Sequence, residues 1–303
     1  MKSLSFFMVP LVVVAVLIPA DPCPVSAEQP DHVVNLWPND PPGGRMDIGP
    51  EQDMTKDTDK LIAGRRIIKL GNVSTPQAHV YLPPTNLHTG ASVVICPGGG
   101  FSILAWDLEG TEVAQWLNTQ GIAGIVLKYR VPTREQNPRW MPAVQDTQRT
   151  ISLVRHHAEE WKLDAGKTGV LGFSAGGMAA FKTSVATKRY YEPVDDADVQ
   201  PFRPDRTILI YAAGLPENAE PGEQDQDAVT ADTPPVFMVH AFDDFVPVQG
   251  PANLLLALKR AGVASELHVY DAGGHGYGLR RRSDLPVTHW TEPCEVWLHR
   301  AGY

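Results

Sequence analysis

One serine of this 303-residue chain is flanked by glycines in a way that suits nucleophilic chemistry. Ser174 lies in the segment GFSAG (172–176), after a short apolar run and before a segment with helical spacing. A nucleophile on a tight strand-to-helix turn has a strained backbone, and glycines two positions to either side avoid a clash there. The pattern therefore predicts a serine hydroxyl held out above a sheet, in preference to a serine that only caps a helix.

A serine hydroxyl is a weak nucleophile until a base takes its proton, so an acid and a histidine are needed nearby. On strand–turn–helix nucleophiles these two follow the serine in the chain, each beyond a strand. Asp243 and Asp244 follow one predicted strand, and His275 lies in a glycine-rich loop after the next. We therefore predict a catalytic triad of Ser174, Asp244 and His275.

An ester-cleaving serine also needs N–H groups that stabilise the oxyanion of the tetrahedral intermediate. Three consecutive glycines, Gly98–Gly100, follow a predicted strand, and their backbone is unobstructed by side chains. We expect the N–H groups of Gly99 and Gly100, with that of Ala175, to form this oxyanion hole. A phosphate-binding loop is the alternative, but no Lys-Ser/Thr pair follows these glycines.

Apolar runs rich in β-branched residues alternate with longer segments of helical spacing along most of the chain. The predicted strands are Ala78–Leu82, Ser92–Cys96, Ile122–Tyr129, Gly169–Gly172, Thr207–Tyr211, Val236–His240 and Glu266–Tyr270. The predicted helices are Gly110–Thr119, Met141–Trp161, Ala175–Thr187, Pro251–Ala261 and Pro293–Arg300. Strands that are apolar on both faces and alternate with helices are typical of an α/β fold, with a mostly parallel central sheet and helices on both faces.

Charge and composition exclude several classes of partner. The net charge is −9 and no segment is dominated by Lys or Arg, so we expect no binding to nucleic acid. The one basic cluster, Leu279–Ser283, is typical of a solvated loop. No Asp/His cluster has metal-ligand spacing, so neither a metal nor a cofactor is expected. Cys96 ends an apolar run, which indicates a small core residue.

The first residues have the layout of a secretory signal peptide. Lys2 precedes an apolar stretch over residues 4–18, and the small residues Val25, Ser26 and Ala27 suit a cleavage site after Ala27. A membrane anchor is the alternative, but Pro10 interrupts the apolar stretch, which is shorter than the roughly 20 residues that span a bilayer. We therefore expect a signal peptide at 1–27, and a single domain at 28–303 that is secreted or periplasmic, without stable membrane insertion.

Linked motifs over nearly the whole mature chain resemble the secreted carbohydrate esterases of the α/β-hydrolase superfamily, the acetylxylan and feruloyl esterase-like group. The motifs are LWPNDPPG, ICPGGGFSILAWDLEGTEVAQWLNTQGI, VLKYRVP, AVQDTQRTISLVRHHAEEW, GFSAGGMAA and ELHVYDAGGHGYGLR. The resemblance implies the α/β-hydrolase fold and a serine esterase. Its substrates would be acetyl or feruloyl esters of plant polysaccharide such as xylan or its oligosaccharides, or another small ester.

The chain departs from the family's spacing at the acid. The distance from His240 to Asp244 matches the family, but Asp244 lies one residue too close to the following Val-Pro pair. Counting back from Val-Pro gives Asp243 instead. We predict Asp244, because distance from the strand end fixes position more firmly than the following turn, and Asp243 stays the alternative.

Two further questions stay open in the sequence. Phe101, Trp106 and Tyr277 lie on or near the glycine loops, where they could stack on a sugar ring or, equally, pack beneath the loops. The alternative functions are a small serine peptidase of the prolyl-oligopeptidase type and a non-catalytic hydrolase-fold binding protein. Residues 28–303 leave no room for the propeller of such peptidases, and binding proteins of this fold typically lose the serine or the histidine. No oligomeric state is predicted.

Overall fold

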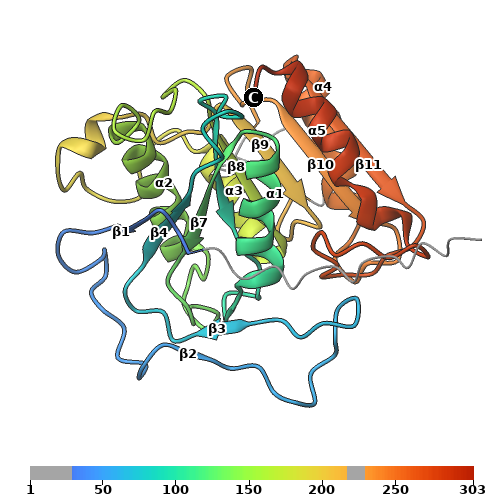
Figure 1. Ribbon diagram of the computed structural model, residues 1–303, viewed down its shortest axis with the longest axis horizontal. Helices are drawn as coiled ribbons and strands as arrows, with labels where there is room; N and C mark the ends of the chain where they lie inside the picture. The colour runs from blue at the N-terminus through green and yellow to red at the C-terminus, as the bar shows by residue number, and fades with distance from the viewer. Residues whose placement is uncertain (1–28, 217–228) are drawn as a thin grey trace, which may run out of the picture.

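A computed structural model describes residues 29–216 and 229–303, and Figure 1 shows how their helices and strands are arranged. The predicted signal peptide, residues 1–27, lies outside the described residues. In the part of the chain that is described, no helix has both the length and the apolar character needed to cross a membrane.

A mostly parallel sheet of eight strands runs through the molecule in the order β1-β4-β7-β5-β8-β9-β10-β11. These strands are β1 (His32–Asn35), β4 (Gln77–Tyr81), β7 (Ala123–Lys128), β5 (Ser92–Cys96), β8 (Thr168–Phe173), β9 (Arg206–Ile210), β10 (Val236–Ala241) and β11 (Ser265–Tyr270). Only the β1–β4 and β4–β7 pairs are antiparallel, and all the others are parallel. The fold class predicted from the sequence is confirmed.

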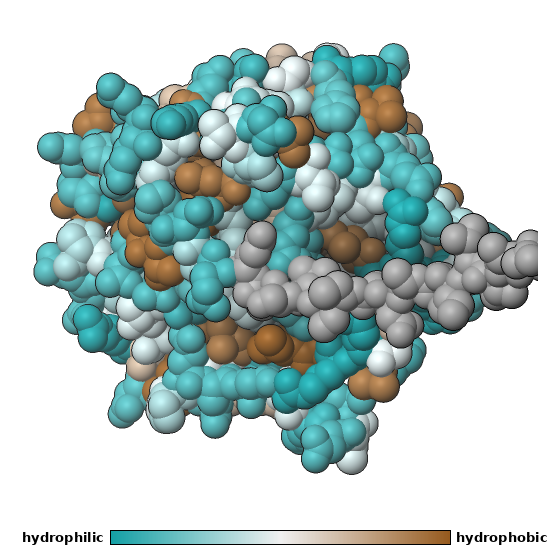
Figure 2. Space-filling model, viewed as in Figure 1, coloured by the Kyte–Doolittle hydropathy of each residue, from teal (hydrophilic) through white to brown (hydrophobic). Residues whose placement is uncertain are grey.

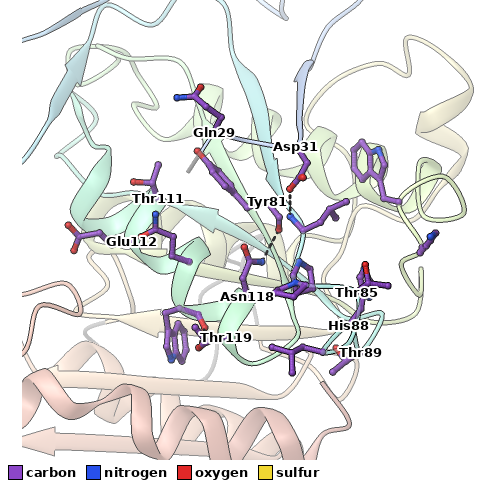
Figure 3. Close-up of a pocket in the computed structure, with 18 of the residues that line it drawn as sticks. Gln29, Asp31, Tyr81, Thr85, His88, Thr89, Thr111, Glu112, Asn118 and Thr119 are labelled. Carbon is purple, nitrogen blue, oxygen red and sulfur yellow. Dashed lines mark hydrogen bonds between the residues drawn. The ribbon is translucent and has the colours of Figure 1, made fainter. Parts of the chain in front are cut away.

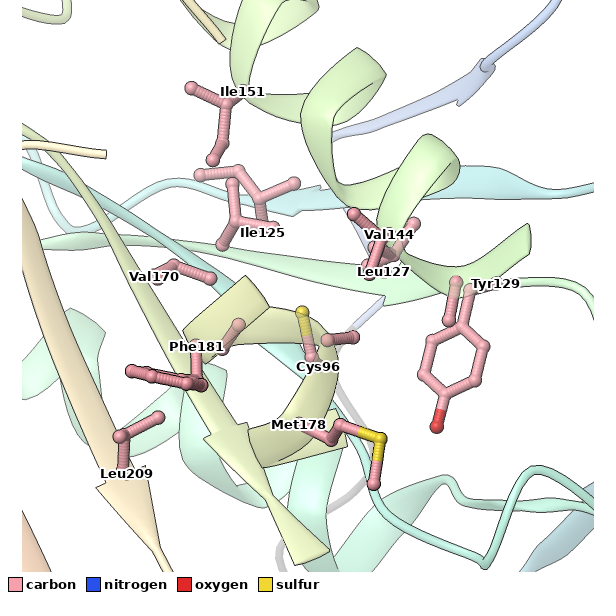
Figure 4. Close-up of a cluster of buried hydrophobic side chains, with 14 of the residues drawn as sticks. Cys96, Ile125, Leu127, Tyr129, Val144, Ile151, Val170, Met178, Phe181 and Leu209 are labelled. Carbon is pink, nitrogen blue, oxygen red and sulfur yellow. The ribbon is translucent and has the colours of Figure 1, made fainter. Parts of the chain in front are cut away.

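Helices cover both faces of this sheet. They are α1 (Glu112–Thr119), α2 (Met141–His156), α3 (Ser174–Val185), α4 (Gln249–Ala261) and α5 (Thr291–Arg300). Successive side chains of a strand point to opposite faces, so a strand that is buried on both faces contributes side chains to two hydrophobic cores. Val94 and Cys96 of β5 pack with residues of α2 and α3, as Figure 4 shows for Cys96, and Val93 and Ile95 pack with residues of α1 and α5.

Smaller elements complete the fold. β2 (Gln52–Asp53), β3 (Lys69–Gly71) and β6 (Leu104–Ala105) form a separate three-stranded sheet, with β2 and β3 along the lower side of Figure 1. A π-helical turn, η1 (Asp107–Thr111), leads directly into α1, and two 3-10 turns are η2 (Asp196–Val199) and η3 (Pro286–His289). The helix predicted over Gly110–Thr119 therefore begins as a tighter-bonded α-helix only at Glu112.

The basic cluster at Leu279–Ser283 is a correction to the sequence analysis. Arg280 is only 5% exposed, because its guanidinium lies in a pocket of oxygen acceptors. It donates to Glu112 at 2.8 Å and to Asp107 at 2.9 Å, and to three backbone carbonyls of the segment 62–66. The cluster is therefore not solvated throughout, since Arg280 ties the segment after β11 to the start of α1.

The outer surface is largely polar on the face seen in Figure 2, where hydrophobic residues form small, separate groups. Inside, Cys96 and Cys294 are both buried free thiols. Burial of Cys96 at the end of β5 confirms its expected place in the core.

Candidate active site

The carboxyl ends of the parallel strands bring distant parts of the chain to one edge of the sheet. Gly98–Gly100 follow β5, Ser174 follows β8, Asp244 follows β10, and His275 follows β11. These strands are neighbours or near neighbours in the sheet, so the loops after them meet. Ligand and catalytic sites of open α/β sheets lie at this edge.

Ser174 has a left-handed backbone conformation at the junction of β8 and α3, with φ of 50°. Such a conformation is costly for a residue with a side chain, and it persists only where the surroundings enforce it. A Cβ on Gly176 would contact the carbonyl oxygens of Cys96 and Pro97, and one on Gly172 would contact the backbone of Gly176. The glycines are thus required by close backbone approach, and the turn they permit lifts the Ser174 hydroxyl into the site.

The three residues of the predicted triad lie in one hydrogen-bonded chain. His275 Nε2 is 2.8 Å from Ser174 Oγ, and His275 Nδ1 is 2.8 Å from Oδ2 and 3.0 Å from Oδ1 of Asp244. The Asp244 side chain is fully buried and that of His275 is 16% exposed. With its proton on Nδ1, the imidazole donates to Asp244 and leaves Nε2 to accept from the serine hydroxyl.

The two neighbouring aspartates have different partners. Asp243 Oδ1 accepts a hydrogen bond from the N–H of Gly274 at 2.7 Å, whereas Asp244 holds the His275 ring. Asp244 Oδ1 also accepts from the N–H of Val246 at 2.8 Å, and His240 Nε2 lies 2.9 Å from the Val246 carbonyl. Asp244 is therefore the aspartate that contacts the His275 ring, and Asp243 contacts only the backbone of the loop that carries His275.

The three amides expected at the oxyanion hole line the same cavity as Ser174 and His275, which has a volume of about 540 Å³. Gly99 and Gly100 have φ of 133° and 63°, which lets their loop fold tightly beside the serine. Ala175 is the second residue of α3, and N–H groups in a first helical turn have no acceptor within their helix. The first turn of α3 thus borders the cavity, and the positive end of the α3 dipole favours negative charge there.

A buried carboxylate that the sequence analysis did not single out lies directly behind this loop. Glu109 is 4% exposed, accepts from the Gly98 N–H at 2.7 Å through Oε2, and accepts from the Tyr211 hydroxyl at 2.7 Å through Oε1. Burial raises the pKa of Glu109, and its hydrogen bonds from Tyr211 and Gly98 oppose that rise. Tyr211 in turn packs its ring 4.8 Å from that of His275 and accepts from the Gly278 N–H at 3.1 Å.

The aromatic residues proposed for sugar stacking are mostly packing residues, which corrects one of the two interpretations. Tyr277 is 4% exposed and packs edge-on against Tyr211, with ring centroids 4.5 Å apart. Phe101 reaches the cavity lining but is 1% exposed, and Trp106 packs edge-on against His79. A buried ring has no free face to offer a sugar, so the structure favours packing beneath the loops.

An exposed aromatic ring does lie at the cavity, and the sequence analysis missed it. Phe245 is 79% exposed and its ring centroid is 4.5 Å from that of His275. It lines the cavity together with Val246 and Met178. Its position immediately after Asp244 was the available signal, because a residue next to the triad acid must lie near the histidine.

A larger groove lies along α1, as Figure 3 shows. Its labelled side chains come from the start of the described chain, the end of β4 and the segment after it, the last residue of η1, and α1. They include Asp31, Tyr81, His88 and Asn118, and neither Ser174 nor His275 is among its lining residues. Across residues 29–216 and 229–303, no three His, Cys, Asp or Glu side chains are grouped as a metal site requires.

Similarity to characterised sequences agrees with this geometry. Residues 78–206 match the family described as BD-FAE. The acetylxylan esterase of Xylanibacter ruminicola is 32% identical over 215 residues, which is 63% of this chain and 42% of that protein. The chain thus spans less than half the length of this curated relative.

Solved structures extend the similarity to almost the whole chain. The acetyl ester-xyloside bifunctional hydrolase from Caldicellulosiruptor lactoaceticus is 30% identical with a TM-score of 0.68, covering 90% of this chain and 97% of that one. A thermophilic esterase from Thermogutta terrifontis, 23% identical with a TM-score of 0.65, covers 75% of this chain and 90% of its own, and shares the fold. Because a solved relative is matched over nearly its full length, the chain belongs to the acetylxylan esterase-like family of the α/β-hydrolase superfamily.

Proposed function

We propose that this protein is a serine esterase that hydrolyses acyl esters of xylan or its oligosaccharides with Ser174, His275 and Asp244. The observation that carries the proposal is the continuous hydrogen-bonded chain from Ser174 Oγ through His275 to Asp244, which opens into a cavity lined by Gly99, Gly100 and Ala175. Each component of an acyl-transfer site is therefore within reach of the others.

In the first half of the reaction, Ser174 Oγ attacks the carbonyl carbon of the ester while His275 Nε2 takes the hydroxyl proton. The negative charge moves to the carbonyl oxygen, where the N–H of Ala175 and that of Gly99 or Gly100 stabilise it. Each such donor is worth about 3 kcal/mol in the transition state. Asp244 stabilises the imidazolium, and collapse of the intermediate expels the alcohol, which takes the proton from His275.

In the second half, water replaces the alcohol. His275 Nε2 removes a proton from that water, whose oxygen attacks the acyl carbon of the acyl-enzyme. The resulting oxyanion occupies the same N–H groups, and its collapse releases the carboxylic acid and returns the proton to Ser174. Only neutral imidazole can act as the base in this step.

The substrate follows from the relatives and the cavity together. An acetylxylan esterase and an acetyl ester-xyloside hydrolase are among the proteins this chain is similar to. A cavity of about 540 Å³ is of the size that takes a small ester or one or two sugar units. Phe245, exposed at its rim, offers a ring face on which a sugar can stack. Acetyl and feruloyl groups are both candidates for the acyl part.

We also propose that residues 28–303 form one domain that is exported after removal of residues 1–27. The apolar stretch at 4–18, with small residues at 25–27, supports this, as does a substrate found outside cells.

The central experiment compares hydrolysis of 4-nitrophenyl acetate by the wild type, Ser174→Ala, His275→Ala and the double variant. Each single change should lower kcat by at least about 10³-fold, and the double variant should be no worse, because the two residues act as one unit. A phosphonate should label the wild type once per chain at Ser174. Ser74→Ala, outside the cavity, is the matched control and should keep full activity.

Substantial turnover by Ser174→Ala would refute the proposal. A wild type that binds acetylated xylo-oligosaccharide but hydrolyses no ester would point to the binding-protein alternative, and cleavage of prolyl peptides in preference to esters would point to the peptidase.

A further inference from the structure

Most of the charged side chains that line the catalytic cavity are basic, although the protein as a whole has a net negative charge. The net charge of the protein is −9. Around Ser174, however, the lining includes four basic side chains and one acidic one, namely Lys60, Lys69, Arg134, Arg139 and Glu109. Clefts lined by one sign of charge attract ligands of the other sign.

Two of the five charges are already satisfied by other groups. Lys69 Nζ forms an ion pair with Asp59 at 2.8 Å, and Glu109 is buried and bonded to Tyr211 and Gly98. Among residues 29–216 and 229–303, no carboxylate forms an ion pair with Lys60, Arg134 or Arg139. Other arginines of this part of the chain, such as Arg130, Arg149 and Arg280, do have carboxylate partners.

Arg134 and Arg139, the two arginines without a carboxylate partner in the described part of the chain, are held next to Gly98–Gly100, the loop expected to hold the oxyanion and called here the oxyanion loop. The N–H of Thr133 donates to the carbonyl of Phe101 at 2.7 Å, and the Thr133 hydroxyl donates to the carbonyl of Arg139 at 2.9 Å. Arg134 Nη1 lies 3.3 Å from the point where a Cβ on Gly100 would be. The segment that carries both arginines is therefore fixed against the loop that would hold the oxyanion.

We infer that this site prefers esters that carry a carboxylate close to the scissile bond, with Arg134 as the main specificity-determining residue and Arg139 beside it. The inference rests on the proposed esterase function and names its substrate class. A guanidinium binds a carboxylate through two parallel N–H···O bonds, a geometry that a neutral acetylated sugar cannot provide. The carboxylate can lie on the sugar, as in an acylated uronoside, or on the acyl group, as in a dicarboxylic half-ester.

The test uses two matched substrate pairs at low ionic strength. Acetylated methyl glucuronoside against acetylated methyl glucoside places the carboxylate on the sugar. 4-Nitrophenyl hemisuccinate against 4-nitrophenyl butyrate places it on the acyl group, with the uncatalysed rate subtracted because the hemisuccinate attacks its own ester. We expect kcat/KM for the anionic member of at least one pair to exceed that of its neutral partner by about tenfold.

Added salt should reduce this ratio, because screening weakens interactions between exposed charges. Arg134→Gln should bring the ratio close to one, and Arg139→Gln should lower it less. Arg281→Gln is the matched control, since that side chain is 57% exposed and pairs with Glu292 outside the cavity. Its ratio should equal that of the wild type.

The pair that shows the preference identifies the source of the carboxylate. Ratios near one for both pairs in the wild type would overturn the inference, as would a ratio unchanged in Arg134→Gln. The proposed function would survive either result if the neutral esters are still cleaved through Ser174, so the two failures are distinguishable.

Discussion

Asp243 and Asp244 are adjacent in the chain, but their side chains have different partners in the site. The backbone after β10 turns so that Asp244 faces the His275 ring from a fully buried position, while Asp243 accepts from the backbone N–H of Gly274. The first contact fixes the tautomer and orientation of the imidazole. The second fixes only the loop that carries it.

Substituting each aspartate by asparagine separates these roles. Asp244→Asn should lower kcat by several orders of magnitude, because the amide N–H would face the imidazole N–H and the imidazole would lose its acceptor. The corresponding change in a serine protease costs about 10⁴-fold. Asp243→Asn keeps an oxygen that can accept from Gly274 and should cost less than about tenfold. Steady-state kinetics on 4-nitrophenyl acetate decides between them, with circular dichroism to check folding. The reverse ranking would make Asp243 the acid.

At the scale of single residues, chain order was a good guide and side-chain direction was not. Ser174 was predicted from its flanking glycines between a strand and a helix, and His275 from its place in a loop beyond the strand that follows the acid. For Phe101 and Tyr277 the sequence left sugar stacking and packing equally open, and the structure buries both rings. Phe245 was overlooked although it adjoins the acid, since an exposed Phe in a turn carries no periodic signal.

At the scale of elements, the π-helical turn η1 explains how a charged side chain comes to lie inside the molecule. A turn with one extra residue before α1 directs Glu109 toward Gly98 and Tyr211, so the carboxylate links the oxyanion loop to the residue that packs on His275. The predicted helix began at Gly110, one residue after Glu109, so nothing in the sequence indicated that this side chain is buried. We infer that Glu109 is a positioning residue, which acts on the reaction through the loops it holds.

Two variants of Glu109 test this positioning role. Glu109→Gln can accept from the Gly98 N–H and donate to the Tyr211 oxygen, so most of kcat should be retained. Glu109→Ala leaves two buried donors, the Gly98 N–H and the Tyr211 O–H, without their acceptor, each costing about 1–3 kcal/mol, and frees the oxyanion loop. We expect kcat to fall at least about tenfold with little change in KM. Equal losses of kcat in both variants would contradict a role through hydrogen bonds that glutamine can also make, and an unchanged kcat in the alanine variant would show that Glu109 has no part in the reaction.

The long strands were predictable because each is a run of apolar, β-branched residues, and all seven predicted strands are present with ends shifted by no more than one residue. β2, β3 and β6 have only two or three residues each, too few to show any period, and were not predicted. β1 alternates between half-buried and exposed residues at the sheet edge, so it lacks the apolar run of the inner strands. Helix ends were predicted less well. The helix predicted over Met141–Trp161 ends at His156, because the residues that follow form turns.

At the scale of the whole molecule, the pairing of charges is the part that sequence could not supply. The composition shows that the net charge is negative. It does not show that Arg280 forms an ion pair with Glu112, which is distant in the sequence, or that Arg130 forms a buried ion pair with Asp146. Such contacts join residues that are distant in the sequence, and they appear only once the sheet is assembled. Removing one partner of a buried pair of this kind typically costs about 3–5 kcal/mol.

Stability should also depend on pH through His79 of β4. Burial, with a smaller contribution from the charge of Lys128, lowers the pKa of His79 to about 4. The folded state therefore binds fewer protons than the unfolded state, whose histidines titrate near about 6.5. The stability that neutral His79 contributes is fully present above that value and is lost as the pH falls toward about 4.

Thermal unfolding measured in steps from about pH 7 to about pH 4 tests this linkage. Replacing His79 by Gln, which carries no titrating group, should make the decrease in Tm across this window smaller than in the wild type. The difference in unfolding free energy should be below about 3 kcal/mol, because part of the ring is exposed and water screens its charge. His299→Gln, on the exposed side of α5, is the control and should follow the wild type. If His79→Gln and the wild type lose stability in parallel over the whole window, protonation of other groups must drive the acid transition.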